Sequence, residues 1–148
     1  MSLKEQLTTD MKEAMKSHDK DRLAVIRMVR GAIRQQEIDG QKELSDEDVI
    51  AVMSKEIKMR KDSIEEFKKG GREDLIAKTQ AEIDVLMPYM PAQLSEDEVR
   101  ELVKAAVAET GAATPKDMGR VMGALMPKVK GRADGKLVNT LVRSMLQG

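Results

Sequence analysis

Apolar residues recur at helical spacing along most of the chain. The first stretch, residues 3–17, carries Leu3, Leu7, Met11 and Met15 four positions apart, which places all four on one face of a helix. No segment of the sequence shows the two-residue alternation of β-branched and aromatic side chains that is typical of strands. The pattern therefore predicts an all-α protein.

Start and stop signals divide the residues before Pro88 into four predicted helices. The second covers residues 21–38, and Gly40 stands where this helix is expected to stop. The third begins after Ser45, whose hydroxyl can accept a hydrogen bond from the backbone amide three residues on. It ends at the pair Gly70-Gly71, and the fourth helix ends before Pro88, because proline has no N–H to continue it.

Two prolines, Pro88 and Pro91, interrupt the periodic patterns on both sides and favour an extended backbone. We therefore expect a linker over residues 88–94. This linker would join a helical amino-terminal domain, residues 1–87, to a three-helix carboxy-terminal domain, residues 95–148.

Three helix starts are readable in the carboxy-terminal domain. Ser95 and Glu98 form a capping-box pattern, and Pro115 follows a threonine at the first position of the next helix. Pro127 is expected to terminate the apolar stripe of that helix, and Asp134 to cap the last one.

Composition excludes several classes of protein. The 148 residues include no Cys and one His, so disulfide scaffolds, zinc ribbons and thiol enzymes cannot be built. The only larger rings are Phe67 and Tyr89, so stacking of single-stranded RNA bases is not expected. The longest uncharged stretch, Val85 to Ser95, is far shorter than the roughly 20 apolar residues of a membrane span.

The sequence contains no recognisable catalytic motif. Phosphate-cradling glycine loops, nucleophile elbows and zinc-binding helix motifs do not occur in it, and His18 is expected to be an exposed turn residue. We therefore predict no catalytic residues, no metal ligands and no cofactor, and leave open whether the chain takes part in an enzyme. Residues 1–10 show no secretory or transit signal, so the sequence predicts a cytoplasmic protein.

Charge is balanced overall but not locally. The chain has 26 basic and 26 acidic residues, whereas residues 111–148 hold seven basic and two acidic residues, a net charge of +5. A weaker candidate patch consists of Arg27, Arg30 and Arg34, which have no close acidic partner before Glu37. One end of the molecule is therefore predicted to be basic, and basic surfaces attract nucleic-acid backbones.

Two features give this basic end a candidate binding surface. Gly119 and Gly123 lie four residues apart in a predicted helix, where each costs roughly 1 kcal/mol relative to alanine. Either they let a partner such as a phosphate backbone approach the main chain, or they pack tightly against a neighbouring helix. The loop from Lys128 to Gly135 adds cations before a helix start, which favours an anion, although such loops also serve solubility.

The order of these residues resembles a known family. Three segments of the carboxy-terminal domain resemble the helical tail of the B subunit of glutamine-dependent aspartyl/glutamyl-tRNA amidotransferase. They are Met118-Gly119-Arg120-Val121-Met122, Gly131-Arg132-Ala133-Asp134 and Val138-Asn139. With Arg27-Met28-Val29-Arg30 and the segment 89–95, the whole chain resembles the stand-alone YqeY proteins of the GatB/YqeY family. Gly135 departs from the proline that usually follows the Ala-Asp pair in the amidotransferase tails.

Together with the basic end, the resemblance implies a non-catalytic protein that binds or handles tRNA through its carboxy-terminal domain. The residues expected to contact phosphates, or to permit close approach, are Gly119, Arg120, Gly123, Lys128, Lys130, Arg132 and Lys136. The expected partner is tRNA, together with a tRNA amidotransferase or synthetase, and no membrane is involved. Two alternatives stay open: an accessory part of a carbon-nitrogen ligase reaction with glutamine as nitrogen donor, and a helical protein-protein adaptor.

Overall fold

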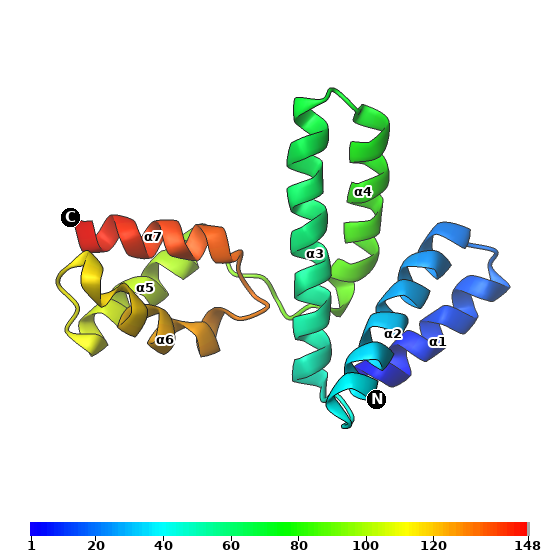
Figure 1. The fold of residues 1–148 in the computed structure, drawn as a ribbon, viewed down its shortest axis with the longest axis horizontal. Coiled ribbons are helices and arrows are strands. Elements are labelled where there is room, and N and C mark those ends of the chain that lie inside the picture. Colours follow the sequence, from blue (N-terminus) through cyan, green and yellow to red (C-terminus); the bar gives the residue numbers. More distant parts are fainter. Residues whose placement is uncertain (148) are drawn as a thin grey trace. The chain divides into compact units, whose positions relative to one another are not determined.

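The structure of the protein is a computed structural model that describes residues 1–147. Within this range the chain forms seven α-helices and two short 3₁₀ turns, and no strand. The all-α prediction is confirmed. The chain divides into two compact units, Met1–Met90 and the residues from Pro91 onward (Figure 1).

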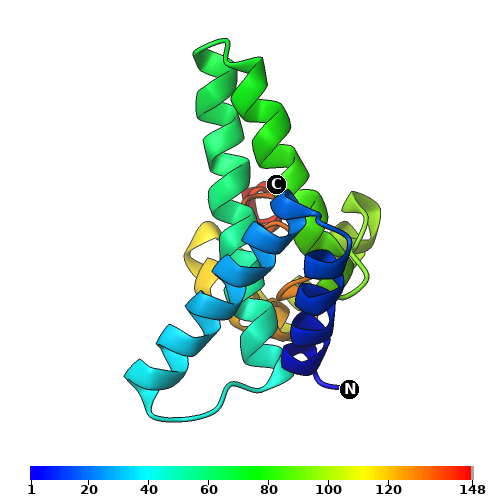
Figure 2. The same cartoon turned by 90° about the vertical axis from the view of Figure 1, so that its right-hand side faces the viewer.

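The first unit consists of two antiparallel helix pairs, α1 with α2 and α3 with α4 (Figures 1 and 2). A 3₁₀ turn, η1, follows the second pair. The bounds of these elements are Leu3–Lys16 for α1, Lys20–Gly40 for α2, Asp46–Lys69 for α3, Glu73–Leu86 for α4 and Met87–Tyr89 for η1.

The core of the first unit is built from the apolar faces that the periodicity predicts. Ile26 and Val29 of α2, Met53 of α3 and Leu86 of α4 are at most 1% exposed. Burying each such side chain contributes about 1.5–3 kcal/mol. Because Ile26 and Val29 take up the inward face of α2, a neighbouring face of the same helix is left to carry polar side chains.

Helix ends at Ser45, Ser95 and Gly40 follow the predicted start and stop signals. The hydroxyls of Ser45 and Ser95 accept hydrogen bonds from backbone amides three residues on, at 3.2 and 3.1 Å. α2 ends at Gly40, where the sequence predicts its stop, although Gln41 and not the glycine adopts the left-handed conformation, with φ of 52°. A tertiary contact accompanies this turn: the Glu37 carboxylate accepts a backbone N–H of the following loop at 2.9 Å.

The segment between the two units is anchored at both of its ends. Tyr89 is 8% exposed in the core of the first unit, and its hydroxyl donates to Asp10 of α1. In the second unit, the Gln93 side-chain amide donates to the carbonyl of Gly131 at 2.9 Å, and the Leu94 N–H donates to the carbonyl of Arg132 at 2.8 Å. The part of the predicted linker that is free of such contacts is therefore shorter than residues 88–94.

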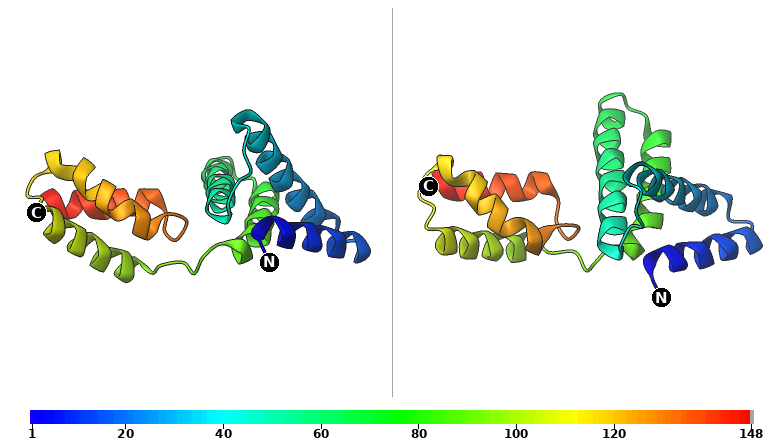
Figure 3. Two further views of the ribbon diagram at one scale, coloured as in Figure 1. Left: turned by 90° about the horizontal axis from the view of Figure 1, so that it is seen from below. Right: turned by 60° about the horizontal axis from the view of Figure 1, so that its bottom comes forward.

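The second unit packs three helices around one apolar core (Figure 3). The fully buried residues include Val99 and Val103 of α5, Leu125 of α6 and Val142 of α7. A 3₁₀ turn, η2, precedes α6. The bounds are Glu96–Thr110 for α5, Pro115–Asp117 for η2, Met118–Val129 for α6 and Gly135–Gln147 for α7.

The prediction that Pro127 terminates the stripe of α6 is wrong, because the helix continues to Val129. Proline removes one backbone donor, the one that would pair with the carbonyl of Gly123 four residues earlier. Val129 is 2% exposed in the core of the second unit. Packing of the last turn therefore offsets the lost hydrogen bond.

Candidate functional site

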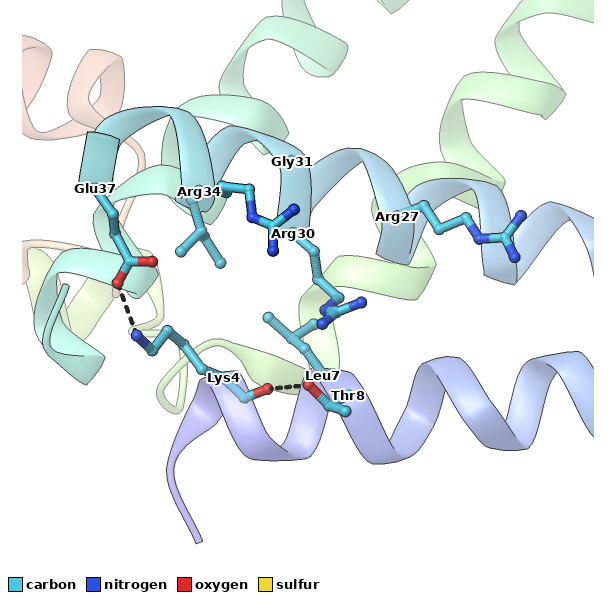
Figure 4. Close-up of a pocket in the computed structure, with 9 residues that line it drawn as sticks. Lys4, Leu7, Thr8, Arg27, Arg30, Gly31, Arg34 and Glu37 are labelled. Atoms are coloured by element: carbon cyan, nitrogen blue, oxygen red, sulfur yellow. Dashed lines mark hydrogen bonds and ion pairs between the residues drawn. The ribbon is translucent and has the colours of Figure 1, made fainter. Parts of the chain in front are cut away.

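A cleft of about 450 Å³ lies between α1 and α2 in the first unit (Figure 4). Its walls are mainly polar and carry more positive than negative side chains. The residues that line it are Lys4, Leu7 and Thr8 of α1 and Arg27, Arg30, Gly31, Ile33, Arg34 and Glu37 of α2.

Three arginines of α2 form one row along this cleft. Arg27, Arg30 and Arg34 are spaced by three and four residues, so they share one face of the helix. Arg30 and Arg34 extend from α2 toward α1, and Arg27 lies further along the helix, away from Glu37 (Figure 4). The row is placed here because the neighbouring face of α2, with Val29, is packed in the core.

None of the three arginines is neutralised by a carboxylate at contact distance within residues 1–147. Arg30 donates from Nη1 to the Sδ atom of Met11 at 2.9 Å, and a thioether is a weak acceptor. Arg34 acts on Glu37 only through its electrostatic field. The guanidinium groups therefore keep donors that an oxyanion could take up.

Lys4 and Glu37 close one end of the cleft. The Lys4 ammonium donates to the Glu37 carboxylate at 2.7 Å, and the Leu44 N–H donates to the same oxygen at 2.9 Å. The hydrogen bond from Lys4 is the main reason that the pKa of Glu37 lies below its usual value, with the bond from Leu44 adding to the effect. Glu37 is therefore ionised at neutral pH, and it joins α1, α2 and the loop after α2.

The charged side chains that line the cleft sum to +3, from Lys4 and the three arginines against Glu37. A concave surface with one sign of charge focuses the electrostatic field and concentrates ions of the opposite sign. Arginine also binds carboxylate and phosphate groups with two parallel hydrogen bonds. The arrangement is therefore suited to bind an anion.

A second cleft of the first unit, about 690 Å³ between α2 and α4, differs in its charge. Its lining carries three cations, Arg22, Arg60 and Lys78, against three carboxylates, Asp19, Asp21 and Glu82. Arg60 lies 2.8 Å from Glu56 and 3.4 Å from Glu82. The contact with Glu82 is too poorly aligned to be a hydrogen bond, and Arg60 Nε is left buried without one. Because the charges of its lining sum to zero, the larger cleft offers no comparable site for an anion.

The residues predicted from the sequence to bind nucleic acid lie in the second unit, on and around α6. Arg120 donates to Asp117 at 2.7 Å and to the carbonyl of Thr110 at 3.3 Å. The backbone N–H of Ala113 is the first cause, and Arg120 the second, that lowers the pKa of Asp117 to about 2. The guanidinium group of Arg120 is therefore already bound by groups of the second unit.

Two of the loop cations of the second unit, Lys128 and Arg132, also have local partners. Lys128 lies 3.9 Å from Glu109 at the end of α5, and Arg132 donates to the carbonyl of Ala92 at 3.2 Å. Lys130 is exposed. Lys136 lies at the start of α7, where its backbone N–H donates to the side chain of Asp134 at 2.8 Å and so confirms the predicted cap.

Gly119 and Gly123 lie on the exposed surface of α6. A Cβ atom added to either would meet no atom of another part of the chain within 4 Å. The tight-packing explanation for these glycines is therefore wrong, and the main chain beside them is open. Arg120 and Lys130 lie about 15 Å apart along the helix at 1.5 Å per residue, so the seven predicted residues do not form one compact cluster.

The sequence predicted that the three arginines form a basic patch, but it did not indicate the cleft that they line. Lys4 and Thr8 complete it from α1, and Lys4 reaches Glu37 across 33 residues of chain. A pairing of that sequence separation depends on how α1 and α2 pack, which periodicity alone does not specify. The apolar positions Leu3, Leu7 and Met11 indicated which face of α1 packs, but not what lies beside it.

Among residues 1–147, no group of three or more His, Cys, Asp or Glu side chains is placed to hold a metal ion. In the same range, the helices are too short or too polar for any of them to traverse a bilayer.

Comparison with known proteins places the chain in a family. The family model described as Yqey-like protein matches residues 4–146. The chain belongs to the YqeY-like family. The resemblance seen in the sequence is thereby confirmed for nearly the whole chain.

Relatives in three fungi share the name "Altered inheritance of mitochondria protein 41, mitochondrial". The Pyrenophora tritici-repentis protein is 36% identical over 146 residues, covering 95% of this chain and 78% of that protein. The Lachancea thermotolerans protein is 37% identical over 74% of this chain, and a Saccharomyces cerevisiae protein 36% over 71%. The chain matches 60% of the length of each of the latter two.

These names contradict two predictions made from the sequence. The relatives are named as mitochondrial proteins, so the predicted cytoplasmic location is wrong. Their names point to a mitochondrial member of the family and not to a tRNA-handling protein, so that predicted function is corrected as well. Neither the tRNA-handling function nor its two alternatives are retained. That the seven residues around α6 contact a nucleic acid stays a prediction without structural support.

Proposed function

We propose that the protein binds a small anionic ligand that carries phosphate groups, in the cleft between α1 and α2. The observation that carries this proposal is the row of Arg27, Arg30 and Arg34, which face the cleft without a contacting carboxylate within residues 1–147. Arginine side chains are costly to gather without counter-charges, since like charges repel. A bound anion would supply the missing charge.

The size of the cleft favours a small molecule. Its volume of about 450 Å³ lies within the range of about 300–1,000 Å³ typical of small-molecule sites. The Lys4–Glu37 pair closes one end, so the space is bounded and not a flat surface.

The charge of the lining favours phosphate over a single carboxylate. The net charge of +3 exceeds what one carboxylate can balance, whereas phosphate groups carry more negative charge and more acceptor oxygens. Each guanidinium can donate two hydrogen bonds to one phosphate. Arg30 would exchange its weak thioether acceptor, Met11, for a charged oxygen.

Calorimetric titration of the full chain with inorganic diphosphate at low salt tests this proposal. We expect binding to the unaltered protein and a loss of at least about tenfold in affinity for Arg30→Gln combined with Arg34→Gln, because each removes a charge-assisted hydrogen bond of about 1.5–3 kcal/mol. The matched control is Lys116→Gln combined with Arg143→Gln, two exposed cations of the second unit.

The control variant should bind diphosphate as the unaltered protein does. Binding that is absent at low salt, or equally weak in the two double variants, would contradict the proposal. Circular dichroism of each variant verifies that its helices are intact, and none of the four side chains is buried.

A further inference from the structure

The length of the arginine row restricts the shape of the ligand, and this step rests on the proposed function. Arg27 and Arg34 are seven residues apart on one helix, which corresponds to about 10 Å along its axis. A single phosphate group is small compared with that distance. It could engage Arg30 and one neighbour, and would leave the rest of the row unused.

The two ends of the row differ. At the Arg34 end, the carboxylate of Glu37 repels an anion and is itself held by Lys4 at 2.7 Å. At the other end Arg27 is exposed, with no hydrogen bond or ion pair in the described part of the chain, and Figure 4 shows it furthest from Glu37. Because Lys4 balances the charge of Glu37, a short anion can lie between Arg30 and Arg34, and a longer one can extend along α2 to Arg27, whose donors are unused.

The lining has few groups that could read a nucleobase. No aromatic side chain lines the cleft, and the chain's two larger rings, Phe67 and Tyr89, belong to other elements. A base can stack on a ring or on a guanidinium group, but its identity is read by polar groups placed along its edge. Of the six polar side chains that line the cleft, four are cations, one is the Glu37 carboxylate, and Thr8 alone is neutral.

We propose that the ligand is a linear chain of at least three phosphoryl groups, bound along α2 by Arg27, Arg30 and Arg34, with no contribution from a base or sugar. Each guanidinium then pairs with one phosphoryl group of the chain. Gly31, which is exposed and lies between Arg30 and Arg34, places no side chain in the path of the ligand.

The test is a series of calorimetric titrations with orthophosphate, diphosphate, tripolyphosphate and ATP, without divalent cations. We expect affinity to rise at least about tenfold from diphosphate to tripolyphosphate, since one further charge-assisted contact is made. ATP should bind no more tightly than tripolyphosphate. Equal affinity for diphosphate and tripolyphosphate, or clearly tighter binding of ATP, would overturn the inference.

A single substitution sharpens the test. Arg27→Gln should weaken the binding of tripolyphosphate about tenfold and leave that of diphosphate unchanged, because diphosphate is satisfied by Arg30 and Arg34. Equal weakening of both ligands, or of neither, would contradict the inference. If diphosphate binds and depends on Arg30 and Arg34 while the chain-length effect is absent, the proposed function stands and this inference fails. If none of the four ligands binds, both fail.

Discussion

The two basic regions of the molecule differ in where their counter-charges lie. The region around α6 and α7 has the larger excess of positive charge in the sequence, +5 over residues 111–148. In the structure, Arg120 is paired with Asp117 and Lys128 lies near Glu109. On α2 the excess is smaller, but Arg27 and its neighbours face a cleft with one carboxylate at its end. Net charge over a segment therefore does not locate an anion site.

The packing of the helices explains this difference. Asp117 is three residues before Arg120, so that pair is local. Lys128 meets Glu109 because α6 packs beside α5, which ends close to it. On α2, the acidic residues at its beginning and end, Asp21 and Asp39, do not contact the arginine row. Glu37, the acid that lines the cleft, is held by Lys4, so the site is defined as much by the lack of a carboxylate in contact with the arginines as by the arginines themselves.

The largest effect that separates the two regions is expected from charge reversal. Arg30→Glu combined with Arg34→Glu should weaken diphosphate binding by about a hundredfold or more, because two charge-assisted contacts are replaced by repulsion. Lys128→Glu combined with Lys130→Glu, in the second unit, should change it less than about twofold. The measurement is calorimetric titration at fixed low salt. A larger loss for the second pair would reverse the comparison.

A smaller effect, of opposite sign in the two units, is expected for two glycines. Gly123→Ala should stabilise the protein by about 1 kcal/mol, since alanine is the better helix former and its Cβ meets open space. Gly71→Ala in the first unit should destabilise it by about 1–2 kcal/mol, because Gly71 has φ of 66° although its surroundings are equally open. Urea unfolding of both variants measures the two changes, and the same sign for both would be inconsistent with this backbone argument.

The smallest effect concerns acid stability. Glu37 and Asp117 both have a pKa below the usual value, so each stabilises the native state above its unfolded pKa and loses this contribution as the pH falls through its native pKa. Glu37→Gln should therefore cease to differ from the unaltered protein as the pH falls below 4.5, and Asp117→Asn as it falls from 3.8 to about 2.

Urea midpoints of the two variants between pH 7 and 2 measure this dependence. The destabilisation by Asp117→Asn should persist to a lower pH than that by Glu37→Gln. A difference from the unaltered protein that grows on acidification would show that these carboxylates do not stabilise the fold by the contacts described.

Local chemistry was sufficient to predict much of the fold. The caps at Ser45 and Ser95 and the all-α class follow from residues within one helical turn of each other. The prediction failed at Pro127, where the burial of Val129 in the last helical turn outweighs the local preference. Tertiary packing decided this case.

The candidate site could be predicted only in part. The spacing of Arg27, Arg30 and Arg34 showed that they share a face, but the cleft also needs Lys4 from another helix. The neutralisation of Lys128 by Glu109 could not be foreseen either, because these residues are 19 positions apart and meet only through the packing of α5 on α6. The sequence identified the arginine patch, and the structure showed which cations have no carboxylate in contact and can bind an anion.

Titration of ¹⁵N-labelled protein with tripolyphosphate, followed by NMR of the backbone amides and arginine side chains, tests the central claim most directly. Binding in the α1–α2 cleft predicts that the shifts concentrate at Lys4, Thr8 and the row from Arg27 to Arg34, with little change in the second unit. Shifts concentrated instead between Lys128 and Lys136 would contradict the claim and assign anion binding to the other basic region.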